Sequence, residues 1–133
     1  MNKQVLILGA VFGLTAVILG AFGAHGLKDL ISAEQIATFE TGVRYQMYHA
    51  LFLLFVGMMP DIELKTKRVI FYLVLAGILL FSGSIYGLAT NSLTPFDFKT
   101  IGFITPIGGL LLIISWLLLL VKFLKNKSEI SIN

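Results

Sequence analysis

Three long stretches of the sequence contain no charged side chain and are almost entirely apolar, namely residues 5–24, 69–89 and 101–121. A helix of about 20 residues rises about 30 Å, which matches the hydrocarbon thickness of a membrane. Only 13% of the 133 residues are charged, whereas soluble domains contain about 25%. The sequence therefore predicts an integral membrane protein, with residues 1–133 as a single membrane domain.

A further spanning helix is predicted around the apolar residues 45–59, which are too few to cross a membrane alone. Ser32 and Gln35 have the spacing of a capping box, which starts this helix at residue 33. Apolar residues then recur at helical spacing at Ile36, Phe39, Val43, Met47, Ala50 and Leu54. The second helix is thus expected to be extended, amphipathic in its outer part and apolar all round in its inner part.

The predicted fold is an all-α, four-helix transmembrane bundle with helices at residues 5–24, 33–58, 69–89 and 101–122. Seven basic residues flank one side of it, namely Lys3, Lys65, Lys67, Arg68, Lys122, Lys125 and Lys127. Three belong to the other side, namely Lys28, Arg44 and Lys99. Because basic residues accumulate on the cytoplasmic side, both termini are predicted in the cytoplasm. Residues 123–133 are then a basic cytoplasmic tail, and residues 26–33 and 91–98 lie outside.

Two segments allow alternative interpretations. The first apolar stretch, with Ala21-Phe22-Gly23 near its end, resembles a signal peptide with a cleavage site, although signal cores usually run about 7 to 15 residues and this one is longer. In the last stretch, Pro106 either occupies the first helical position with Thr105 as the cap, or kinks a longer helix.

Polar residues from all four helices are predicted at one depth, about 20 to 30 Å from the cytoplasmic boundary at 1.5 Å per residue. They are His25, Glu40, Arg44, Ser82, Ser84, Tyr86 and Thr105. One hypothesis is a polar pocket open to the outside, in which Arg44 supplies the charge and Glu40, one turn away, is its partner. The alternative is that Arg44 extends to the interface along its own stem and Glu40 lies in headgroup water.

His49 is predicted at the middle of the membrane, since it lies ten residues before Met59, or about 15 Å. Glu40 projects from another face of the same helix, so no carboxylate on that helix surface compensates a charged imidazole. We expect His49 to be buried, neutral at pH 7 and bonded to another helix, with Tyr86 or Ser82 as possible partners. The alternatives are a proton relay or a ligand-binding group.

Small residues recur on two of the predicted helices. Gly9, Gly13, Ala16 and Gly20 form one such face, and Gly83 and Gly87 are four residues apart on another. Small residues let membrane helices approach closely. The sequence therefore predicts helix packing at Gly9, Gly13, Gly20, Gly83 and Gly87, in preference to ligand binding there.

The residue types present argue against several classes of chemistry for this sequence. It has no cysteine, so disulfides, thiolate metal sites and cysteine nucleophiles are excluded. His25 and His49 differ in predicted depth by about 15 Å, which argues against a haem held by both. Its ten basic residues are scattered over helix ends and form no nucleic-acid-binding arm. The prediction is a protein with no catalytic residues, metal or cofactor, and no nucleic-acid partner.

Four segments together resemble a known family. They are GAFGAHGL at residues 20–27, FETGVRYQMYHA at 39–50, FSGSIY at 81–86 and TPIGG at 105–109. These segments are similar to the successive signatures of the domain-of-unknown-function family 423, which includes the animal transmembrane protein 256. The resemblance covers nearly the whole chain up to Lys122. It implies a four-helix, multi-pass protein of the bacterial inner membrane, without established enzymatic activity.

These observations favour a non-enzymatic membrane protein that supports membrane integrity or assists a partner complex. The rival hypothesis is a small transporter or lipid-binding protein that uses the outer polar pocket. The expected partners are the lipid bilayer and either another membrane protein or further copies of the same chain.

Overall fold

The computed structural model describes residues 1–125 and contains four α-helices and two short 3-10 helices. Their bounds are α1 Asn2–His25, α2 Ala33–Met58, α3 Leu64–Ala89, η1 Asn91–Leu93, η2 Phe98–Ile101 and α4 Ile104–Lys125. The predicted all-α, four-helix fold is confirmed. Most of the predicted basic tail lies outside the described residues.

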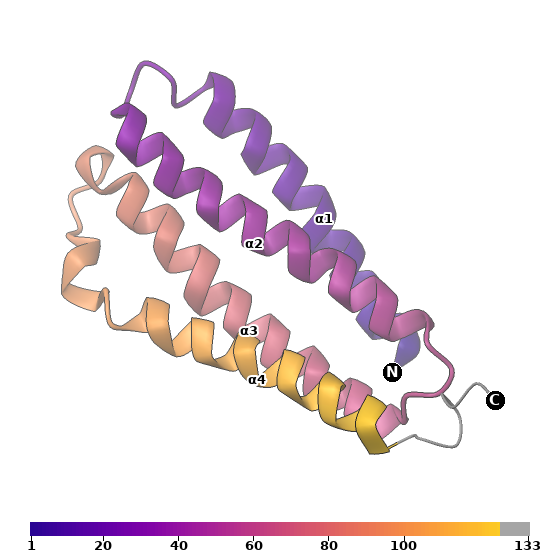
Figure 1. The fold of residues 1–133 in the computed structure, drawn as a ribbon. Coiled ribbons are helices and arrows are strands. Elements are labelled where there is room, and N and C mark those ends of the chain that lie inside the picture. The colour runs from indigo at the N-terminus through magenta and orange to yellow at the C-terminus, as the bar shows by residue number, and fades with distance from the viewer. Residues whose placement is uncertain (126–133) are drawn as a thin grey trace.

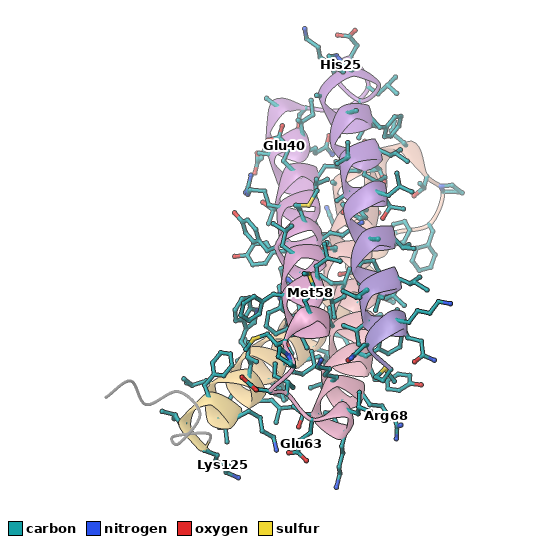
Figure 2. The ribbon with its side chains drawn as sticks, turned by 90° about the vertical axis from the view of Figure 1, so that its right-hand side faces the viewer. His25, Glu40, Met58, Glu63, Arg68 and Lys125 are labelled. Carbon is teal, nitrogen blue, oxygen red and sulfur yellow. The ribbon has the colours of Figure 1, made fainter. Side chains whose placement is uncertain are left out.

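The helices run alternately up and down in chain order, with α2 beside α1 and α3 beside α2 (Figure 1). The fourth helix packs mainly on α3, and its C-terminal part leans away from α1 and α2 (Figure 2). The start of α1 and the end of α4 lie at the same end of the bundle (Figure 1). This arrangement agrees with an even number of membrane crossings.

Helices α1, α3 and α4 are each long and apolar enough to cross a membrane. Many of their large apolar side chains face outward, such as Leu14, Leu79 and Leu117, which are 63%, 60% and 54% exposed. Helix α2 is more polar, but it runs antiparallel to α1 along the bundle (Figure 1). The exposed apolar belt is what a lipid environment requires of a membrane bundle.

The second helix begins where the capping box predicts. The backbone N–H of Gln35 donates to the Ser32 hydroxyl at 3.1 Å, and the Gln35 side chain accepts from the Ser32 N–H at 2.9 Å. These two bonds satisfy N–H groups that the first turn of a helix leaves without partners. Residues 33–58 are therefore helical, as predicted.

The last helix begins three residues later than predicted, at Ile104, because η2 occupies residues 98–101. Pro106 is the third residue of α4, in its first turn. The first four N–H groups of a helix have no partner within the helix, so the missing N–H of Pro106 costs no hydrogen bond here. Pro106 thus lies neither at the first helical position nor at a kink of a longer helix.

Glycine packing partly follows the prediction. A Cβ atom added to Gly9 would lie 3.0 Å from the carbonyl oxygen of Ala50, so α1 and α2 approach closely there. At Gly13 and Gly20 the same test gives ordinary contacts with α2, at 3.7 and 3.4 Å. At Gly87 the near neighbour is the ring of Phe98, at 2.6 Å, and this contact is with η2 rather than with a long helix.

The predicted packing role of Gly83 is wrong, because Gly83 is exposed and an added Cβ would meet no atom within 4 Å. The contact between α3 and α4 instead uses Gly108. A Cβ there would lie 2.8 Å from the carbonyl oxygen of Gly77 and still closer to the backbone N of Phe81. Backbone atoms cannot move aside as a flexible side chain can, so Gly108 sets the separation of these two helices.

Candidate functional site

The predicted outer polar pocket does not assemble around its charged members. His25 is exposed at the end of α1, and Glu40 is exposed on α2 (Figure 2). Arg44, on the same helix, is also exposed. Arg44 donates to the hydroxyl of Thr41, on its own helix, at 3.1 Å, and no ion pair joins it to Glu40. The reason is rotational, since the buried face of α2 includes Phe39, Gly42, Gln46 and His49. Residues 40 and 44 therefore project away from that face.

The uncharged members of the predicted pocket lie inside the bundle but face different neighbours. The Ser82 hydroxyl donates to the carbonyl oxygen of Gly42 on α2 at 2.7 Å. The hydroxyls of Ser84 and Thr105 are 2.5 Å apart and join α3 to α4. These side chains thus link neighbouring helices and do not share one cavity.

Gln46 joins three helices and was not among the predicted site residues. Its side-chain nitrogen donates to the carbonyl oxygen of Phe12 at 3.0 Å and to the hydroxyl of Thr15 at 2.6 Å, both on α1. Its side-chain oxygen accepts a 2.6 Å bond from the Tyr86 hydroxyl on α3. The signal for this role was present in the sequence, because a glutamine within a largely apolar stretch of a membrane helix needs partners.

A groove lies over this hydrogen-bonded chain. Its volume is about 310 Å³, and it is lined by Val11, Phe12, Thr15, Leu19, Gln46, Ile78, Leu79, Gly83 and Tyr86. Gly83 lines this groove without a side chain, and a Cβ added to it would meet no atom within 4 Å. The groove therefore combines an apolar wall with the polar atoms of Thr15, Gln46 and Tyr86.

His49 is buried, at 4% exposed, and both of its ring nitrogens are hydrogen-bonded. Nδ1 lies 2.7 Å from the carbonyl oxygen of Tyr45, which can only accept, so Nδ1 carries the proton. Nε2 lies 3.0 Å from the indole N–H of Trp116, which can only donate, so Nε2 is the acceptor. This pattern requires a neutral imidazole.

The partner of His49 on another helix is Trp116 of α4, not Tyr86 or Ser82, whose hydroxyls bond to α2. Trp116 was missed by the sequence analysis. A tryptophan whose ring is largely within the membrane usually places its N–H on an acceptor, and His49 is such an acceptor at similar depth. The pair forms a hydrogen bond between α2 and α4, beside the ring contact of Phe52 with Trp116.

Beside this pair, a second cavity of about 300 Å³ separates α2 from α4. Its walls are almost entirely apolar and aromatic, and are formed by Tyr45, His49, Phe81, Gly109, Leu112, Ile113 and Trp116. The tilted rings of Tyr45 and Phe81 lie 5.1 Å apart, and those of Phe52 and Trp116 lie 4.2 Å apart, measured between ring centroids. The polar groups of the histidine are occupied, so this cavity offers mainly an apolar surface.

Lys67 was interpreted from the sequence as a flanking basic residue, but its side chain is buried, at 1% exposed. Its ammonium group donates to the Asn2 side chain at 2.8 Å and to the carbonyl oxygen of Gly57 at 3.3 Å. It therefore ties the start of α1 and the end of α2 to α3. A buried cation keeps its charge only when such oxygens replace its hydration.

Across residues 1–125, every buried side-chain nitrogen or oxygen has a hydrogen-bond partner. In the same residues, no group of three histidine, aspartate or glutamate side chains is close enough together to hold a metal ion. The buried polar side chains of the described residues thus all have hydrogen-bond partners.

Comparison with known proteins gives consistent matches. The profile of the family "Protein of unknown function (DUF423)" matches residues 19–109. A UPF0382 membrane protein of Staphylococcus saprophyticus is 42% identical, over 92% of this chain and 98% of its own length. The UPF0382 membrane protein YwdK of Bacillus subtilis is also 42% identical, with the same coverage of both chains. A UPF0382 membrane protein of Haemophilus influenzae is 40% identical over 96% of this chain and 99% of its own. No solved structure matches the chain.

Proposed function

The chain belongs to the DUF423 family of membrane proteins, and on that premise we propose that it is a non-enzymatic, multi-pass protein of the cytoplasmic membrane. Residues 1–133 form a single membrane domain in this proposal. The domain acts as a packed helical unit that supports membrane integrity or a partner membrane complex. The observation that carries the proposal is the bridging of three helices by Gln46, which bonds to both α1 and α3.

The state of the histidines supports a structural role for the buried polar residues. An enzyme active site presents a nucleophile or base to a cavity, with a group that orients it and room for substrate. His49 lines a cavity, but its two nitrogens are bonded to Tyr45 and Trp116. His25 lies at the exposed C-terminal end of α1 (Figure 2). Neither is arranged as a base beside a nucleophile.

A deletion strain tests this proposal. Loss of the protein is expected to raise dye permeability or lower the membrane potential, and the unaltered gene is expected to restore both. Variants Gln46→Leu, His49→Leu and Arg44→Ala are then compared. A structural role predicts that rescue follows the amount and thermal stability of folded protein. Arg44→Ala should rescue fully, since its side chain is exposed and bonds only within α2 among the described residues.

Two outcomes contradict the proposal. One is a fully stable Arg44→Ala or His49→Leu protein that fails to rescue, because that result assigns a chemical task to the side chain. The other is a deletion strain with unchanged permeability and potential, which removes the membrane-integrity role.

The second candidate function is binding of a small amphipathic molecule in the groove beside Gly83. The observation that favours it is the combination of open space at Gly83 with the polar chain of Thr15, Gln46 and Tyr86. Gly83→Leu places a side chain in the groove, and its first added atom, Cβ, would meet no atom within 4 Å. Val17→Leu is the matched control, since Val17 is 61% exposed on α1 and does not line the groove. Loss of rescue by Gly83→Leu alone, at unchanged stability, favours binding, and full rescue contradicts it.

A further inference from the structure

A furrow follows the seam between α3 and α4 from the charged end of the bundle toward its middle. Two cavities make up the furrow, and they share Val69. The first, of about 260 Å³, is lined by Glu63, Lys65, Thr66, Val69, Leu118 and Lys122. The second, of about 380 Å³, is lined by Arg68, Val69, Tyr72, Leu73, Ala76 and Leu111. From residue 65 to residue 76 the helix rises about 17 Å, roughly half the hydrocarbon thickness.

The mouth of the furrow is positively charged. Lys65 and Arg68 are three residues apart, so they lie on one face of α3, and both side chains are exposed. Lys122 of α4 is also at the mouth, paired with Glu63 at 2.9 Å. The carboxylate of Glu63 is also attracted by Lys65, so one negative charge faces the three cations Lys65, Arg68 and Lys122. The mouth therefore keeps a net positive charge, and Lys65 and Arg68 are exposed on it. Arg68 and Glu63 both lie at the end of the bundle opposite His25 (Figure 2).

The walls below the mouth change from polar to apolar in the order that a membrane lipid does. Tyr72 lies one turn below Arg68 and is 58% exposed, and tyrosine rings favour the headgroup boundary. Leu73 and Leu111 follow, and Ala76 leaves the lower end of the furrow open. The seam thus offers cations at headgroup level and an apolar channel beneath them.

We propose that the α3–α4 furrow binds one anionic phospholipid, with its phosphate at Lys65 and Arg68 and an acyl chain laid along Tyr72 and Ala76. Charge complementarity selects the anionic headgroup, because each basic residue near an anionic lipid surface contributes about 1 kcal/mol, or roughly a factor of five in affinity. The length and apolar walls of the lower furrow select a lipid over a free phosphate. This site is separate from the groove at Gly83, and it holds whether or not the proposed structural role does.

The opposite end of the bundle provides a matched control. Lys28 and Lys99 are exposed there, in the same number as Lys65 and Arg68. In the sequence, Asp29 follows Lys28 and Asp97 precedes Lys99 by two positions. Removing these two lysines changes the net charge by the same amount without touching the furrow.

Native mass spectrometry of the full chain in detergent, titrated with phosphatidylglycerol or phosphatidylcholine of equal chain length, tests the proposal. The unaltered protein should retain one phosphatidylglycerol in preference to phosphatidylcholine. Lys65→Gln with Arg68→Gln should weaken that binding roughly 30-fold, by two factors of about five. Lys28→Gln with Lys99→Gln should leave it unchanged. Ala76→Phe, which blocks the lower furrow with the cations intact, should weaken binding of long-chain lipid.

Thermal unfolding of each variant establishes that it is folded. Because Lys65 and Arg68 are exposed, the Lys65→Gln, Arg68→Gln variant is expected to fold and still tests the proposal if Ala76→Phe does not fold. Equal retention of both lipids overturns the proposal. So does unchanged binding in the Lys65→Gln, Arg68→Gln protein, or an equal loss in the two double variants, because that would be general charge attraction.

Discussion

At the scale of single residues, the pairing of His49 with Trp116 shows what depth can and cannot predict. Counting residues from Met59 placed His49 deep in the membrane, and the structure buries it at 4% exposed. Depth alone did not identify Trp116 as its partner, since that contact depends on how α4 is rotated and how far it leans. The same limit applies to Gln46, whose three bonds require α1, α2 and α3 to be in register.

Replacing one member of the His49–Trp116 pair should cost more than replacing both. His49→Leu leaves the Trp116 N–H without its acceptor, and Trp116→Phe leaves Nε2 without its donor. An unpaired buried polar group costs about 1 to 3 kcal/mol, whereas removing both partners can be nearly neutral. Thermal unfolding in detergent of the two single variants and the double variant gives the coupling. Additive effects would show that the bond is absent.

The protonation state of His49 has its own measurement. With Tyr45 accepting at Nδ1 and Trp116 donating at Nε2, the ring should be the neutral Nδ1–H tautomer at pH 7. Nitrogen NMR of histidine-labelled protein distinguishes this tautomer from the other and from the charged ring. His25, which is exposed, serves as the internal reference. A charged His49 at pH 7 would exclude the bond from Trp116.

At the scale of helices, the sequence predicts a helix end correctly where residues next to that end form the bonds that cap it. The capping box placed the start of α2 correctly, because both of its bonds are formed within four residues. The start of α4 was placed too early because apolar residues 101–103 do not reveal the 3-10 turn of η2. Glycine spacing likewise identifies a small-residue face but not the neighbour it meets. Gly83 consequently looked like a packing residue while Gly108 was overlooked.

Two glycine substitutions should distinguish a glycine at a helix contact, Gly108, from one that faces open space, Gly83. Gly108→Leu forces a side chain against the backbone of α3 at Gly77 and Phe81, and overpacking of this kind costs about 1 to 3 kcal/mol or more. Gly83→Leu enters open space and should leave the thermal midpoint in detergent unchanged. A destabilised Gly83→Leu with a tolerant Gly108→Leu would mean that α3 is rotated from its described position.

The ion pair between α3 and α4 predicts a pH effect. The hydrogen bond and charge of Lys122 lower the pKa of Glu63 from its ordinary value of 4.5. A carboxyl with a lowered pKa in the folded state adds stability above its unfolded pKa, and loses it as pH falls through the folded pKa. Glu63→Gln should therefore lower the thermal midpoint slightly at pH 7.

The effect of Glu63→Gln should decline as the pH falls below 4.5, vanish below the lowered pKa of Glu63, and shrink in high salt. Lys122→Gln is the matched variant, because it removes the basic partner of the same Glu63–Lys122 ion pair. The ion-pair account fails if Glu63→Gln destabilises the protein more at acidic pH than at pH 7.

At the scale of the whole molecule, charge is divided between the two ends. Lys3, Lys65, Lys67, Arg68, Lys122 and Lys125 lie at the end where α1 begins. The acidic residues of that end are Asp61 and Glu63. Toward the opposite end, Asp29, Glu34, Glu40 and Asp97 accompany Lys28, Arg44 and Lys99. The basic end is predicted to face the cytoplasm. The start of α1 and the end of α4 both lie at this end of the bundle (Figure 1).

Labelling of single introduced cysteines tests this topology most directly, since the chain has none of its own. Ser92, Lys3 and Lys125 are exposed positions in the η1 segment, the start of α1 and the end of α4. A membrane-impermeant maleimide added to intact cells should label Ser92→Cys at once. It should label Lys3→Cys and Lys125→Cys only after the membrane is permeabilised. Labelling of Ser92→Cys and Lys125→Cys from the same side would contradict the four-span bundle.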